Sequence, residues 1–304
     1  MEVSEIANDS NASAHDILLY PCGGRCDSKS TFPGKILTFN GESSAGKCLV
    51  HNSQAVNFFT VSPIDATRPT VFNDWAYAMT MYLGSLDWKS QTSIYRPENR
   101  AVNTKELFLI YAASNCVSFR ERAFTKLSTI GPVEYAGRCK GMHSKRMPGN
   151  FTRRPGTGIF PAPKDGNTNW AGNVELFHKY RFALVMENRN KNGYITEKIL
   201  NAFMAGSIPI YYGTAEVFNV FNRKSFIYYD INDAGRGRRV RDQIAYLERN
   251  KTAYDEMLKE PILANGTQTV EQYFSWSDQV GGGQLKWKIR ELMGFGADSS
   301  SALI

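Results

Sequence analysis

The chain has 304 residues, of which 42% are hydrophobic and 21% charged, as is typical of a globular protein with room for two domains. Lys and Arg number 36 against 29 Asp and Glu. The net charge of +7 suits an anionic partner such as a nucleotide, a phosphate group or nucleic acid, or is simply a solvated basic surface. No stretch approaches the roughly 20 apolar residues of a membrane span, and the N-terminus lacks the basic start and apolar run of a signal peptide.

The N-terminal third is less regular than the rest of the chain. Residues 1–30 are polar and contain a Gly-rich turn, "CGGRC". Short apolar runs predict strands at 35–39 and 55–61, whereas residues 74–84 fit a helix or a strand equally well. A polar, Pro-interrupted linker over 93–103 follows.

Strands and helices alternate from residue 106 onward, which is the pattern of a parallel sheet wrapped by helices. A long basic loop, 138–170, is either a mobile lid that carries Arg153 and Arg154 or a disordered segment, and residues 234–241 are predicted as a basic turn. Strands are predicted at 106–114, 132–137, 181–187, 207–213 and 225–230, and helices at 119–131, 173–180, 196–206, 242–258 and 284–294.

The five cysteines are Cys22, Cys26, Cys48, Cys116 and Cys139. No second cluster with histidine at metal-ligand spacing accompanies Cys22 and Cys26, so the sequence predicts no zinc site. An odd number of cysteines leaves at least one thiol unpaired. We therefore expect a reducing compartment, with two disulfides and one free thiol as the alternative.

A polar cluster lies between two apolar strands, at the start of the helix predicted over 196–206. In open α/β sheets, ligands bind where a parallel strand ends and a helix begins, and a helix N-terminus favours phosphate. Glu197 can accept hydrogen bonds from a ribose diol, and Lys198 can neutralise a diphosphate; the alternative is that both are ordinary surface residues of a helix start. The cluster predicts a nucleotide site and comprises Glu187, Asn188, Arg189, Lys191, Tyr194, Glu197 and Lys198.

Two stretches carry a family resemblance. "ENRNKNGYITEKILNAFMAGSIPIYYG", residues 187–213, resembles the signature of the α1,3-fucosyltransferase family, glycosyltransferase family 10, in which a Tyr-x-Thr-Glu-Lys motif precedes an apolar helix. "LFLIYAASNCVSFRERAFTKLSTIGPVEYAGRC", residues 107–139, is similar to that family's strand, Arg-bearing helix and following turn. The "SNC" and "GRC" triplets look more like eukaryotic or viral members than bacterial ones.

The resemblance implies an α/β protein with the GT-B fold, in which two Rossmann-like domains with parallel sheets face each other across a cleft. Residues 1–105 would form the acceptor-binding domain and residues 106–304 the domain that binds a GDP-sugar, with the last helix packing back on the N-terminal domain. The donor would be GDP-β-L-fucose and the acceptor a sugar hydroxyl of a glycan. The transfer would invert the anomeric centre and give an α-fucoside, expected to be α1,3-linked.

The resemblance also implies roles for individual residues. Arg120 and Lys198 would bind the diphosphate and stabilise negative charge as GDP leaves. Because two cations can replace Mg²⁺, neither a metal nor another cofactor is expected, and the chain has no Asp-x-Asp triplet. Glu197 would hold the ribose, and the remaining donor contacts would come from Asn188, Tyr194 and Thr196.

An inverting transfer needs a general base that takes the proton of the acceptor hydroxyl. The family supplies a Glu from the N-terminal domain, and Glu42 resembles that Glu in its "GEN" form, with Asp65 as a reserve. Val61 stands where the family's "ESP" form has its Glu, and Leu83 replaces an Arg that many relatives carry. The alternative is that Glu42 is a surface residue of a turn.

Other functions are weighed against this one. The same fold could use another GDP-sugar, or the chain could be a GDP-sugar-binding pseudoenzyme without a base. A basic nucleic-acid-binding module is disfavoured, because the aromatic residues lie within strand and helix patterns rather than among exposed cations. No nucleic-acid partner is expected, and a cytoplasmic or viral protein is favoured over the luminal Golgi part of a membrane-anchored enzyme.

Overall fold

The structure is a computed structural model that describes residues 13–21, 32–40, 55–59, 71–72, 106–141, 151–153, 171–266, 268–269, 287, 290–291 and 293–294. The chain divides into two compact units. The first comprises Met1–Tyr77, Lys191–Tyr194 and Val270–Ile304, and the second comprises Ala78–Asn190 and Ile195–Thr269. The boundary expected after residue 105 lies in a stretch outside the described residues, so it stays a prediction.

The first unit contains a 4-stranded parallel sheet in the order β1-β2-β3-β4. The strands predicted at 35–39 and 55–61 are confirmed. The segment predicted as polar and irregular holds β1, which pairs with β2 along its whole length. Lys35 of β2 donates a hydrogen bond to the Met293 carbonyl in the C-terminal segment of the same unit. The strands are β1 (Ile17–Pro21), β2 (Lys35–Asn40), β3 (Ala55–Phe59) and β4 (Val71–Phe72).

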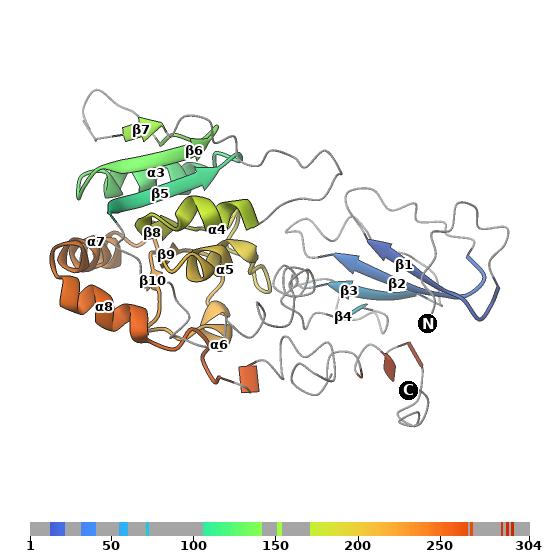
Figure 1. The fold of residues 1–304 in the computed structure, drawn as a ribbon. Helices are drawn as coiled ribbons and strands as arrows, with labels where there is room; N and C mark the ends of the chain where they lie inside the picture. Colours follow the sequence, from blue (N-terminus) through green and yellow to red (C-terminus); the bar gives the residue numbers. More distant parts are fainter. Residues whose placement is uncertain are drawn as a thin grey trace. The chain divides into compact units, whose positions relative to one another are not determined.

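The second unit contains a 6-stranded parallel sheet in the order β10-β9-β8-β5-β6-β7 (Figure 1). Its strands are β5 (Leu107–Ala113), β6 (Val133–Gly137), β7 (Phe151–Arg153), β8 (Tyr180–Leu184), β9 (Ile208–Tyr211) and β10 (Ile227–Tyr228). Its helices are α3 (Ser118–Leu127), α4 (Ala171–Phe177), α5 (Glu197–Met204), α6 (Val217–Val220), α7 (Ala234–Arg249) and α8 (Lys251–Lys259). The alternation of strands and helices predicted from residue 106 onward is confirmed.

The second sheet is buried on both faces because its strands project apolar side chains in both directions. Phe182 and Leu184 of β8 pack in one core with residues of α3, α7 and α8. Ala183 of β8 and Val185 just after it pack in a second core with residues of α4 and α5. Figure 1 shows α7 and α8 on one side of these strands and α4 and α5 on the other. Because successive side chains of a strand point to opposite faces and both faces are buried, nearly every residue of these strands must be apolar.

The basic segment 234–241 is helical, so the predicted turn is wrong. The Asp233 side chain caps α7 by accepting a hydrogen bond from the backbone N–H of Arg236 at 2.9 Å. Ile244 and Leu247 of α7 are buried in the core. Glycines at 235 and 237 favour a turn by about 1 kcal/mol each, but the cap and the buried face outweigh that preference.

One predicted helix, 242–258, is two helices. α7 ends at Arg249 because Asn250 leaves the helical region, with φ −118° and ψ 94°. The Asn250 side chain instead caps α8, accepting a hydrogen bond from the backbone N–H of Ala253 at 3.0 Å. The strong N-cap preference of Asn was the signal for this break.

The long basic loop is not wholly irregular. Phe151–Arg153 forms β7, an edge strand that pairs in parallel with β6. Arg153 therefore lies in a strand of the sheet, and the expectation that it belongs to a mobile lid is wrong for this residue. Arg154 lies outside the described residues. Among the helices that the structure describes, none is both long and apolar enough to cross a membrane.

Candidate functional site

The strand order of the second sheet reverses between β5 and β8. From β5 the chain adds β6 and β7 on one side, and it then returns to add β8, β9 and β10 on the other. This is the order of nucleotide-binding doubly wound sheets, which bind ligands at the carboxyl ends of the two strands that flank the reversal. The sheet thus points to one crevice, beyond Ala113 of β5 and Leu184 of β8.

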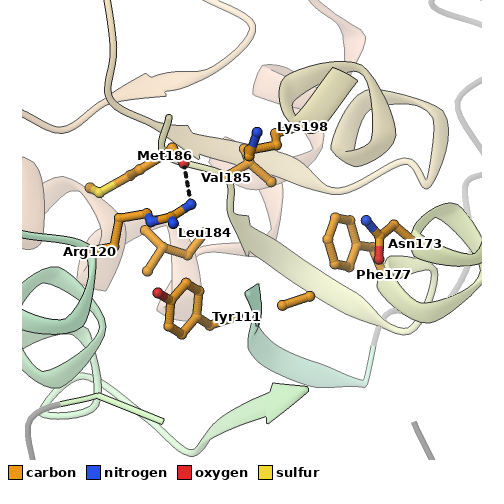
Figure 2. A pocket seen from close by; sticks show the side chains of 9 residues that line it. Tyr111, Arg120, Asn173, Phe177, Leu184, Val185, Met186 and Lys198 are labelled. Carbon is orange, nitrogen blue, oxygen red and sulfur yellow. Dashed lines mark hydrogen bonds between the residues drawn. The ribbon is translucent and has the colours of Figure 1, made fainter. Parts of the chain in front are cut away.

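A pocket lies at this reversal (Figure 2). Arg120 is in the first turn of α3, which follows β5, and Lys198 is in the first turn of α5, which follows β8. Two cations and two helix N-termini, each with partial positive charge, therefore meet at one pocket, which suits an anion. The lining residues are Tyr111, Ala112, Arg120, Asn173, Phe177, Leu184, Val185, Met186 and Lys198.

The Arg120 side chain is held in place by two backbone carbonyls. It is 3% exposed, and its guanidinium donates to the Met186 carbonyl at 3.1 Å and to the Asn115 carbonyl. Figure 2 shows the bond to Met186 at the edge of the pocket. Among the described residues, none accepts a hydrogen bond from the buried Nε of Arg120. The guanidinium thus joins the segments that follow β5 and β8.

Lys198 belongs to a buried polar cluster at the start of α5. The Glu187 carboxylate accepts hydrogen bonds from the backbone N–H of Thr196 at 2.7 Å and from its hydroxyl at 2.9 Å. The Lys198 ammonium lies 3.2 Å from the same carboxylate, 2.7 Å from the Thr196 hydroxyl and 3.7 Å from the Glu197 carboxylate. Burial raises the pKa of Glu187, and the Lys198 ammonium opposes this rise.

Gly213, just after β9, leaves room for this cluster. An added Cβ would lie 2.4 Å from the Tyr211 hydroxyl and 2.9 Å from Cγ of Glu187. Since both side chains are fully buried, we expect Gly213→Ala to lower the free energy of unfolding by about 1–3 kcal/mol, measured by urea denaturation. Gly235→Ala is the control, because its Cβ meets nothing nearer than 3.6 Å at an exposed helical position. Equal stability of the two variants would contradict the crowding.

A second buried carboxylate connects α3 to its neighbours. Glu121 accepts a hydrogen bond from the Tyr111 hydroxyl at 2.6 Å and another from the backbone N–H of Gly141 at 2.7 Å. Burial raises the pKa of Tyr111, which keeps its hydroxyl protonated as the donor. Because Tyr111 lines the pocket, Glu121 fixes one pocket wall and the start of the basic loop together.

Cys116 and Cys139 form a disulfide. It links the segment between β5 and α3, which supplies the Asn115 carbonyl to Arg120, with the segment after β6. The preference for reduced cysteines is therefore wrong for this pair, since adjacent parallel strands end side by side and bring the two residues together. Both sulfurs lie within 4.8 Å of a Glu121 oxygen, but bonded to each other they do not act as metal-ligating thiolates.

Reducing this disulfide should destabilise the protein. It closes a loop with a sequence separation of 23, for which the loss of chain entropy in the unfolded state amounts to about 3 kcal/mol. We expect urea unfolding of Cys116→Ser/Cys139→Ser to show this loss. Unchanged unfolding of the unsubstituted chain on reduction would contradict the prediction.

Of the remaining predicted site residues, some lie near Lys198 and others do not line the pocket. Thr196 and Glu197 lie beside Lys198, whereas Asn188 is half-buried just after Glu187 and is not among the lining residues. Tyr194 is 2% exposed and belongs to the first unit, so its place at the donor stays a prediction. Glu42, Asp65 and Leu83 lie outside the described residues.

Several residues that shape the pocket carry no individual signal in the sequence. Glu187 belongs to the predicted polar cluster, and its complete burial follows from packing that no local pattern reveals. The sequence predicts Tyr111 only as part of a strand and Glu121 only as part of a helix. It likewise predicts Asn173 only as part of a helix, and the place of Asn173 in the pocket wall depends on how α4 packs beside β8.

Comparison with known proteins identifies the family. The profile described as "Glycosyltransferase family 10 (fucosyltransferase) C-term" matches residues 102–261, just over half of the chain. The chain belongs to glycosyltransferase family 10. The matched region includes the pocket, both cations and the polar cluster at the start of α5.

Relatives in this family match mainly over a short segment. The chain is 41% identical over 86 residues to an α-(1,3)-fucosyltransferase of Helicobacter pylori, covering 28% of this chain and 18% of that enzyme. It is 37% identical over 92 residues to a protein of Acanthamoeba polyphaga mimivirus named as a fucosyltransferase, covering 30% of this chain and 15% of that protein. The chain thus spans less than a fifth of either relative. The bacterial and the viral relative match with similar identity over similar lengths, so these two matches do not distinguish a viral from a bacterial affinity.

Solved structures of the family share the fold. A crystal structure of an α1,3-fucosyltransferase has a TM-score of 0.60 at 19% identity, covering 96% of this chain and 80% of that one. A crystal structure of an α1,3-fucosyltransferase with GDP-fucose has a TM-score of 0.54 at 18% identity, covering 98% of this chain and 81% of that one. These similarities confirm the GT-B fold and its α/β character.

Proposed function

We propose that the chain transfers L-fucose from GDP-β-L-fucose to a sugar hydroxyl of a glycan, with inversion, giving an α1,3-fucoside. The observation that carries this proposal is the pocket at the reversal of the second sheet, where Arg120 and Lys198 meet from the starts of two helices. A crystal structure of an α1,3-fucosyltransferase with GDP-fucose, which shares this fold, supports the choice of donor.

In this reaction the acceptor oxygen attacks C1 of fucose while the bond from C1 to the β-phosphate oxygen breaks. The electron pair of that bond goes to GDP, and its growing negative charge is stabilised by Arg120 and Lys198. The proton of the acceptor hydroxyl goes to a carboxylate, for which Glu42 is our candidate. Glu197 holds the ribose, and Asn188, Tyr194 and Thr196 complete the donor site.

Two cations at the diphosphate can supply the charge that Mg²⁺ supplies in other glycosyltransferases. We therefore propose that transfer needs no metal or other cofactor, and we expect full activity after EDTA treatment. The Cys116–Cys139 disulfide favours an oxidising compartment, such as the Golgi lumen, over the cytoplasm.

The proposed function is tested by titration calorimetry and by transfer assays. We expect GDP to bind more tightly than GMP, because the second phosphate reaches the cations. Assays with GDP-fucose, GDP-mannose and GDP-rhamnose identify the donor, and NMR of the product identifies the anomer and the linkage. If GDP does not bind, the proposal is wrong. If GDP binds but no donor is turned over, the chain is a GDP-binding protein without transferase activity.

A further inference from the structure

Glu187 is a completely buried carboxylate to which the proposed chemistry gives no task. It lies three residues after β8 ends at Leu184, and its backbone N–H donates to the Tyr212 carbonyl at 2.8 Å. Burying a carboxylate costs several kcal/mol unless charge and hydrogen bonds compensate. Among the described residues, the compensation comes from Thr196 and Lys198, and both lie at the start of α5.

Thr196 precedes α5 as its N-cap residue, but its side chain does not cap the helix. Its hydroxyl instead lies between the Glu187 carboxylate and the Lys198 ammonium, at 2.9 Å and 2.7 Å. The contacts of Thr196 with Glu187 tie the residue before α5 to the segment that follows β8. The start of the helix is thereby fixed by a group outside the helix.

Lys198 has a long, flexible side chain, and such a side chain loses entropy when it is held for a ligand. Contact with Glu187 and Thr196 restricts the ammonium to one place, and the Lys198 side chain lines the pocket. The Glu197 carboxylate also faces the ammonium, at 3.7 Å. A cation restrained in this way needs little reorganisation when a phosphate arrives.

We propose that Glu187 is a positioning residue, which through Thr196 and Lys198 sets the start of α5 and the lysine ammonium for a diphosphate. This inference rests on the proposed function, because it concerns how the same donor site is assembled. Glu187 itself contacts neither the donor nor the reacting atoms. The opposing interpretation is that Glu187 competes with the phosphate for Lys198, and the two interpretations predict opposite changes in affinity.

The test compares the affinities of GDP and guanosine, which differ only in the diphosphate. In Glu187→Gln the amide oxygen can still accept the Thr196 N–H, but the charge that holds Lys198 is gone. We expect GDP affinity to fall about tenfold, the effect of losing one charge-assisted contact, with guanosine affinity unchanged. Thr196→Val keeps the side-chain shape without the hydroxyl. It should lower the ratio of GDP affinity to guanosine affinity as well.

Glu134→Gln is the matched control, because Glu134 is a half-buried carboxylate of the same sheet that accepts a hydrogen bond from Tyr180 and does not line the pocket. Its ratio of GDP to guanosine affinity should equal that of the unsubstituted chain. Thermal unfolding of every variant is measured in parallel. If Glu187→Gln does not fold, Glu187→Asp replaces it, because the shorter side chain keeps the charge but withdraws the carboxylate from Thr196 and Lys198, and the same selective loss of GDP affinity is expected.

Unchanged or higher GDP affinity in the folded variant would overturn the positioning role. An equal loss of GDP and guanosine affinity would overturn it too, because a purely structural residue would weaken both ligands. Failure of the unsubstituted chain to bind GDP would instead refute the proposed function itself.

Discussion

Lys198→Met should lower GDP affinity about 10- to 100-fold, because the loss of a charge-assisted phosphate contact costs about 1.5–3 kcal/mol. Methionine keeps much of the apolar stem of lysine and removes only the ammonium. The variant also leaves the buried Glu187 without its counter-ion, so a lower melting temperature is expected as well. Calorimetric titration with GDP, performed well below the melting temperature, separates the two effects.

The control for this variant is Lys259→Met, at an exposed position in the last turn of α8. We expect no change in its GDP affinity. Arg120→Ala should weaken GDP binding as well, and it should destabilise the protein because the Met186 and Asn115 carbonyls lose a donor. If Lys198→Met binds GDP as tightly as the unsubstituted chain does, the phosphate lies elsewhere and the assignment of the pocket is wrong.

Glu42→Gln should abolish most fucose transfer without loss of GDP affinity. Removing a general base typically lowers the rate about 10²- to 10⁴-fold, whereas an amide of the same shape preserves binding. The measurement combines single-turnover transfer from GDP-fucose with GDP calorimetry on the same preparation. Such a separation of chemistry from binding is expected of a base that contacts the acceptor rather than the donor.

Asp65→Asn is the comparison variant, since Asp65 is the reserve candidate for the base. Only one of the two substitutions should stop transfer. Full activity of Glu42→Gln with an inactive Asp65→Asn would move the base to Asp65. Full activity of both variants would show that neither carboxylate takes the proton.

The sequence was most informative where strands are apolar on both faces. The runs at 106–114 and 181–187 predicted β5 and β8, since buried parallel strands have this pattern. The sequence was least informative where one helix cap or one neighbouring strand decides which secondary structure a segment adopts. Asp233 converts a Gly-rich basic segment into α7, and pairing with β6 makes a strand of Phe151–Arg153. The Asp233 cap is a local signal that two glycines obscure, whereas the pairing of β7 with β6 depends on residues distant in the chain.

In the candidate site, too, some features could be predicted from the sequence and others could not. Motif spacing placed Arg120 and Lys198 at the starts of two helices, and the reversal of strand order brings them to one pocket. The roles of Glu121 and Glu187 could not be predicted, because a carboxylate in a sequence carries no sign of whether it will be buried. The bond between Cys116 and Cys139 could not be predicted from an odd number of cysteines either.

The sequence by itself determined the α/β class and the family of this chain, and it indicated a phosphate-binding joint between strand and helix. The class follows from hydrophobic period, and the phosphate-binding segment follows from residue type and spacing. The family follows from the resemblance of two stretches to glycosyltransferase family 10. The tertiary structure alone decided which charges are buried, which carboxylate holds Lys198 and which cysteines pair. Those outcomes depend on contacts between residues far apart in the chain, because only the folded sheet brings the ends of β5, β6 and β8 together.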